Sequence, residues 1–170
     1  MKKQSVWLAA IFFASTLAQV IESPRLWAED GGGPIVVIVN TANPIDNLSL
    51  ADLKKIFLSD RSRWDTGKAV APVISVAGAP ERTAFLKTVC HMSDADFSKY
   101  FVQVAFTGKD VTPPKEVPSG REVKSEVASS PGAIGFIRGL DFHGDGSDGG
   151  VKAVKVDGVS ASDPAYKLRM

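Results

Sequence analysis

The sequence predicts an α/β protein in which helices flank a mixed β-sheet. The continuous β-branched run Ile35–Val39 is typical of a strand that is buried on both faces. Apolar residues at helical spacing follow Ser49 and Ser93, and each serine precedes an aspartate by three residues, as at capped helix starts. Strand-like and helix-like segments therefore alternate along the chain, and this order indicates a layered α/β fold.

The other elements are predicted from the same kinds of signal. Pro80 suits the first position of a helix whose apolar stripe includes Phe85. Ser119, with Glu122 three residues later, indicates a further helix, which Ser130-Pro131-Gly132 ends. The expected strands are 35–39, 70–75, 133–137 and 151–156, and the expected loops are 60–68, 107–118 and 141–150. In the helix after Ser93, the residues expected to face the core are Phe97, Phe101, Val102 and Ala105.

The first residues predict an export signal. Two lysines precede the apolar stretch Val6–Val20, which is shorter than the roughly 20 apolar residues of a membrane span. A basic start, an apolar stretch and small residues near its end are typical of a secretory signal peptide. Cleavage is expected after Ala18 or Ala28, and an uncleaved anchor is the alternative. We therefore expect residues 1–28 to be a signal peptide and leader, and residues 29–170 to be one periplasmic domain with no other membrane contact.

Charge and composition exclude several classes of function. Twenty basic residues face 19 acidic ones, so the chain lacks the basic excess of nucleic-acid-binding proteins. One Cys cannot form an intrachain disulfide, and two His with one Cys fall short of the ligands of a zinc site. No nucleophile, base and orienting group stand at a suggestive spacing. We therefore expect no enzyme activity, no metal and no cofactor.

Two local motifs have simple interpretations. Asp141–Asp148 begins like a calcium loop, but Lys152 occupies the twelfth position, where a bidentate glutamate belongs. We interpret this segment as a solvated acidic turn. Cys90 and His91 are adjacent on a helix, so their side chains point about 100° apart. We interpret Cys90 as a packing residue and His91 as a side chain that complements the helix C-terminus.

A series of short motifs covers nearly the whole chain after residue 34. In order, they are Val39–Pro44, Leu53–Leu58, Arg82–Phe85, Phe106–Gly108, Pro131–Phe136 and Val156–Val159. In this order they resemble the periplasmic substrate-binding proteins of phosphate ABC transporters, specifically their short phosphate-binding-protein-like relatives. The resemblance implies a single lobe of the type 2 periplasmic-binding-protein fold, because full-length members hold phosphate between two lobes. It also implies an ABC permease or another envelope protein as a partner.

The candidate site lies at two expected helix starts, Asn47–Ser49 and Gly78–Pro80. Helix starts attract anions through unpaired backbone N–H groups and the positive end of the helix dipole. In open α/β sheets, ligands favour the edge where such helices follow strands. Arg82 can add a bidentate contact to an oxyanion, although its turn, Ala79–Arg82, lacks the hydroxyls of the family's phosphate-binding turn. The residues expected to bind a small anion are Thr41, Asn43, Ser49, Gly78, Arg82 and Thr83.

Each of these residues also has a purely structural interpretation. Ser49 can simply cap its helix, Asn43 can shape its turn, and Arg82 can pair with Glu81 or Asp60. The sequence favours an exported solute-binding protein of the phosphate-transport type, which captures a small oxyanion reversibly without bond chemistry. The alternative is a periplasmic interaction module, built on a single lobe that has lost ligand binding.

Overall fold

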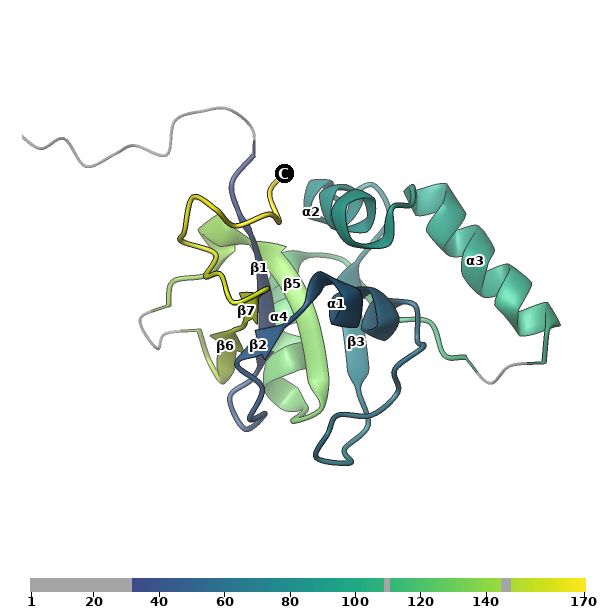
Figure 1. The fold of residues 1–170 in the computed structure, drawn as a ribbon, viewed down its shortest axis with the longest axis horizontal. Coiled ribbons are helices and arrows are strands. Elements are labelled where there is room, and N and C mark those ends of the chain that lie inside the picture. The colour runs from purple at the N-terminus through teal and green to yellow at the C-terminus, as the bar shows by residue number, and fades with distance from the viewer. Residues whose placement is uncertain (1–31, 109–110, 145–147) are drawn as a thin grey trace, which may run out of the picture.

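The computed structural model describes residues 32–108, 111–144 and 148–170 (Figure 1). The strands are β1 (Ile35–Asn40), β2 (Asn47–Leu48), β3 (Ala71–Ser75), β4 (Lys115–Val117), β5 (Ala133–Arg138), β6 (Val151–Ala153) and β7 (Lys155–Val156). Five of them form a sheet in the order β4-β3-β5-β1-β6, while β2 and β7 form a parallel pair. β1 is antiparallel to β5 and β6, whereas β3 is parallel to β4 and β5. The sheet is therefore mixed, as predicted.

Helices cover both faces of this sheet. They are α1 (Leu50–Phe57), α2 (Pro80–Phe85), α3 (Asp94–Phe106) and α4 (Gly120–Ser129), with a π-helical turn η1 (Leu86–Cys90) directly after α2 and a 3-10 turn η2 (Gly139–Asp141). Figure 1 shows α4 behind the sheet and α1 in front of it. The predicted capping boxes at Ser49 and Ser93 are both present. At Ser119 the hydroxyl contacts the Glu122 carboxylate but bonds to no helix amide, so that box is incomplete.

The residues of β1 alternate between two cores. Ile35, Val37 and Val39 face the larger core with α1, α2 and η1, where the rings of Phe85 and Phe136 stack at 3.9 Å between centroids. The intervening residues of β1 join a second core with the valines of α4. All six residues of the strand are buried, which explains its continuous apolar sequence.

The central position of β1 depends on strands from the far end of the chain. Ile35 lies opposite Arg138 of β5, and Asn40 lies opposite Val151 of β6. Ile35 N–H also donates to Leu168 C=O at 2.9 Å. Both strand partners of β1 therefore come from the last third of the sequence, while Asn40 C=O accepts from Asn43 N–H in the turn that follows.

Three predicted segments differ from the structure. The expected loop 107–118 contains β4, an edge strand whose Lys115 and Glu116 are exposed, so it lacks the apolar pattern that predicts a strand. The expected strand 151–156 is divided at Val154 into β6 and β7, which belong to different sheets. The helix after Pro80 continues as the π-turn η1, which increases the residues per turn without changing the apolar stripe.

α3 does not present the expected face to the core. Phe97 is buried and Phe101 is half-buried, but Ala105 is exposed and Val102 is 58% exposed. Phe106, at the end of the helix, is 88% exposed. Figure 1 shows that α3 extends away from the sheet, and the α3 residues that pack in the core or against it are Phe97, Tyr100 and Phe101. The prediction was wrong for Val102 and Ala105 because these side chains lie on the outer part of the helix.

The acidic turn is not fully solvated, because Asp148 is buried. Its carboxylate accepts hydrogen bonds from Lys124 Nζ at 2.7 Å, from Gly144 N–H at 2.7 Å and from His143 N–H at 3.1 Å. Burial alone would raise the pKa of Asp148, but the Lys124 ammonium and the two amides outweigh it and hold the pKa well below its ordinary value. Within the part of the chain that the structure describes, no group of His, Cys, Asp and Glu could hold a metal ion.

Asp148→Asn is expected to lower the free energy of unfolding by about 2 kcal/mol at pH 7, because a charged acceptor of three hydrogen bonds is lost. The native pKa lies below the unfolded one, so this contribution is complete above the ordinary pKa of 3.8 and disappears as the pH falls below it. Urea unfolding of both proteins across this range measures the difference. The matched variant Asp141→Asn, at a half-buried surface pair, should cost little, and a pH-independent cost at Asp148 would contradict its ionised role.

The predicted signal peptide lies outside the described residues. No helix among residues 32–108, 111–144 and 148–170 is long and apolar enough to cross a membrane.

Candidate functional site

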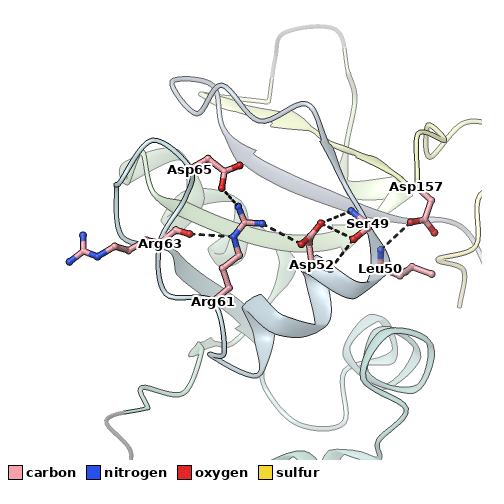
Figure 2. A network of polar contacts seen from close by, with 7 residues as sticks. All are labelled: Ser49, Leu50, Asp52, Arg61, Arg63, Asp65 and Asp157. Atoms are coloured by element: carbon pink, nitrogen blue, oxygen red, sulfur yellow. Dashed lines mark hydrogen bonds and ion pairs between the residues drawn. The ribbon is translucent and has the colours of Figure 1, made fainter.

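The start of α1 is occupied by carboxylates of the chain itself (Figure 2). Ser49 Oγ accepts from Asp52 N–H at 3.0 Å and donates to the Asp52 carboxylate at 2.7 Å. Asp157 Oδ1 accepts from Leu50 N–H at 3.2 Å. Two amides that an anion could contact therefore already have partners, and Ser49 acts as a helix cap.

An arginine extends this network to the loop before β3. Arg61 lies 3.4 Å from Asp52 Oδ1 and 2.7 Å from Asp65 Oδ1, and Figure 2 shows its guanidinium between the two carboxylates. The hydrogen bond from the Ser49 hydroxyl lowers the pKa of Asp52, and the charge of Arg61 lowers it further. The network keeps Asp52 ionised at the positive end of the α1 dipole, where a negative charge is stabilising.

Thr41 and Asn43 belong to the turn between β1 and β2. Thr41 is exposed, and its N–H donates to Gly150 C=O at 2.9 Å. Asn43 is buried, and its Oδ1 accepts from Ile45 N–H at 3.1 Å, which is the structural role of an Asn that shapes its own turn. The hydrogen bonds of the described residues do not connect these side chains with Arg82.

The start of α2 has a different character. Gly78 has a φ of +86°, a conformation that favours glycine, and Ala79 caps the helix without a side-chain hydrogen bond. Pro80 stands at the first helical position, as predicted. Gly78, Arg82 and Thr83 are thus grouped at one end of β3, and a side-chain cap is absent there.

Arg82 is completely buried at this position. Its Nε forms an ion pair with Asp94 Oδ1 at 2.6 Å, and its Nη1 forms one with Glu116 Oε1 at 2.7 Å. Nη1 also donates to Ser75 C=O at 2.8 Å. Among the described residues neither the buried Nη2 nor Nε has a hydrogen-bond partner, so the contact of Nε with Asp94 is an ion pair without hydrogen-bond geometry. The guanidinium is therefore surrounded by oxygen atoms on two sides, the arrangement in which it would hold an oxyanion.

Thr83 joins the same cluster through Asp94. Its exposed hydroxyl donates to Asp94 Oδ2 at 2.9 Å, so the two carboxylate oxygens of Asp94 contact Thr83 and Arg82 respectively. The structure thus brings Arg82 and Thr83 together, and neither Glu81 nor Asp60 is the ionic partner of Arg82. Glu81 is buried instead beside Ser75, whose hydroxyl donates to it at 2.9 Å.

Sequence reasoning missed the acidic partners of Arg82. Glu116 lies 34 positions away in a segment predicted as a loop, and no local spacing signals the contact. Asp94 was recognisable only as an acidic residue in the first turn of a helix. The predicted role of Cys90 holds, because the thiol is buried and burial raises its pKa to about 11. It is therefore a packing residue and a poor nucleophile.

Two hollows adjoin the exposed side of α2 and η1. One has a volume of about 710 Å³ and is lined by residues that include Thr83, Lys87 and Arg169. The other, of about 410 Å³, shares Thr83 and Lys87 and adds His91. Thr83 therefore lines both hollows, while Arg82 lines neither of them.

Comparisons with known proteins address the fold. No family model and no curated protein matches the sequence. Among solved structures, a Clostridium perfringens protein with bound phosphate, described as a phosphate ABC transporter substrate-binding protein, is similar with a TM-score of 0.64 and 24% identity. The match covers 82% of this chain and 53% of that one. An ABC-type phosphate transport receptor from Vibrio cholerae matches with a TM-score of 0.64 and 21% identity, over 82% and 54% of the two chains.

A third similar structure is PstS from Borrelia burgdorferi, with a TM-score of 0.63 and 12% identity over 82% of this chain and 55% of that one. This chain therefore spans about half the length of these neighbours. The predicted fold class, a mixed sheet flanked by helices, is confirmed. By its three-dimensional structure, the chain has the fold of the substrate-binding proteins of phosphate ABC transporters, over about half of their length.

Proposed function

We propose that this protein is an exported solute-binding domain that captures a small oxyanion at Arg82. The observation that carries the proposal is a fully buried guanidinium at the start of α2, in contact with two carboxylates and a carbonyl oxygen, in a fold shared with a phosphate-bound protein. An oxyanion can present two oxygen acceptors to a guanidinium, as a carboxylate does. Phosphate is the first ligand to test.

Glu116 is the partner that an anion would replace. Its side chain is 51% exposed, whereas that of Asp94 is 23% exposed and is also held by Thr83. Glu116 stands on the edge strand β4, so it can turn into solvent without a change in the sheet. Displacement would give the anion access to Nη1 and to the buried Nη2, which lacks a hydrogen-bond partner among the described residues. Binding therefore competes with an internal ion pair.

The α1 start is the weaker candidate because Asp52 and Asp157 already bond to its amides. We infer that Thr83 and Gly78 contribute to binding at α2, while Ser49, Asn43 and Thr41 shape their own turns. In this proposal the protein serves uptake or sensing, with an ABC permease or another envelope protein as its partner, and performs no bond chemistry.

Phosphate is expected to raise the melting temperature, with the rise increasing with the logarithm of its concentration, because a ligand stabilises by RT ln(1 + [L]/Kd). Arg82→Lys keeps the charge but loses the planar fork, so the phosphate-induced rise should largely disappear. The matched change Arg138→Lys, at an exposed pair with Asp141, should leave the rise unchanged. Differential scanning calorimetry of the three proteins measures the effect.

The same experiment also tests the alternative function, a periplasmic interaction module. If the parent protein shows no rise with phosphate, sulfate or a panel of other small anions, the solute-binding proposal fails and the interaction module becomes the better explanation. An equal rise in the parent and in Arg82→Lys would place the anion at another site.

A further inference from the structure

We propose that the exposed side of α2 and η1 docks an acidic, apolar-anchored segment of a partner protein. The two hollows described above share Thr83 and Lys87 as lining residues, and together they are here called the α2–η1 groove. This inference does not depend on anion binding at Arg82, because Arg82 does not line the groove.

Three residues from α2, from η1 and from the end of η1 line the smaller hollow. They are Thr83, Lys87 and His91, which follow one another at intervals of four residues. Eight residues at the helical rise span about 12 Å. An extended peptide covers that distance with about four residues. The groove therefore matches a short segment of chain in length.

The charged side chains that line the two hollows are basic. Lys87 and Arg169 line the groove, and within the described residues neither has a carboxylate within 4.0 Å. Arg169 donates only to the backbone carbonyls of Tyr166 and Asp163, which leave its charge in place. No acidic residue is among those that line either hollow, and nearby Asp94 is already paired with Arg82. Complementarity therefore favours an acidic partner.

The lining also offers apolar contacts. Met92 and Met170 are half-buried and stand in the two hollows, where flexible thioether side chains adapt to an apolar anchor. Volumes of about 410 and 710 Å³ are far larger than a single small oxyanion needs. A hollowed surface also suits a chain segment better than a flat lipid headgroup layer.

The backbone under the groove is unusual. η1 is a five-residue π-helix, a rare conformation that is frequent at functional sites. It ends at His91, whose φ of 58° is uncommon for a residue other than glycine. Leu86, Val89 and Cys90 of η1 are buried in the core, and His91 N–H donates to Leu86 C=O where the turn ends.

The test is fluorescence anisotropy of the purified protein with a labelled hexapeptide in which glutamates alternate with leucines. We expect saturable binding that weakens as salt is added. Lys87→Glu should weaken binding by at least about tenfold, because attraction becomes repulsion at the centre of the groove. The matched variant Lys68→Glu makes the same change of charge in the loop at the opposite end of β3 and should have little effect.

Several results would overturn the docking proposal. They are absence of peptide binding, equal binding of a hexapeptide with lysines in place of the glutamates, or equal losses in Lys87→Glu and Lys68→Glu. Displacement of the peptide by phosphate, at the concentrations that raise the melting temperature, would show a small-anion site in the groove. If phosphate does not raise the melting temperature but the peptide still binds, only the solute-binding proposal is refuted.

Discussion

Arg82→Met is expected to lower the free energy of unfolding by about 3 kcal/mol, because it removes one member of a buried ionic cluster and leaves the others without a counter-charge. Arg82 connects Ser75 of β3, Glu116 of β4 and Asp94 at the start of α3. Its guanidinium also lies 5.6 Å from the Phe97 ring centroid, so the position of α3 depends on it. Urea unfolding followed by circular dichroism measures the loss.

The control for this prediction is Arg138→Met. That guanidinium also contacts one carboxylate at 3.0 Å, but it is 46% exposed, and exposed pairs contribute less than about 1 kcal/mol. Similar losses in both variants would mean that the Arg82 cluster adds little to stability. Arg82→Lys keeps a positive charge in this cluster, and for that reason lysine is the substitution that tests anion binding.

Gly132→Ala is expected to destabilise the protein by about 3 kcal/mol and to lower its melting temperature by roughly 10 °C. A Cβ at this position would collide with the backbone carbonyl oxygen of Ala69, which cannot rotate away. Gly132 C=O also accepts from Trp64 Nε1 at 2.9 Å and from Ala71 N–H at 3.0 Å. The substitution therefore separates the Trp64 loop from the start of β5.

Gly33→Ala is the matched control, because a Cβ there meets nothing within 4 Å. The melting temperatures of the two variants compare a glycine whose added Cβ collides with the backbone with one whose added Cβ meets no other atom. If Gly132→Ala melts close to the parent protein, the approach of the loop to β5 is looser than the structure describes. If Gly33→Ala loses as much, the effect belongs to backbone entropy and not to the collision.

Local signals predicted the elements that depend on local chemistry. The β-branched run of β1, the serine caps of α1 and α3, and Pro80 at the start of α2 all lie where the sequence placed them. Trp64 is buried and anchors the predicted loop 60–68 through its bond to Gly132 C=O. The strand, the caps and the helix start share one property: the residues that determine them stand within a few positions of one another.

The sequence predictions failed where a contact with a residue far away in the sequence determines the structure. β4 has one buried residue and pairs only with β3, so nothing in its own sequence distinguishes it from a loop. The apolar spacing of α3 predicts a helix, but the side that meets the protein is set by the anchor at Phe97. In the candidate site, the residues Arg82 and Thr83 were recognisable, whereas the carboxylates beside them come from segments 11 and 34 positions away.

The position of β1 has a consequence for the order in which the chain can fold. Its strand partners are Ile134 to Arg138 of β5 and Val151 to Ala153 of β6, so the middle of the sheet stays incomplete until residue 153 has left the ribosome. Long-range pairing of this kind is slow, because distant segments must meet before any contact is gained.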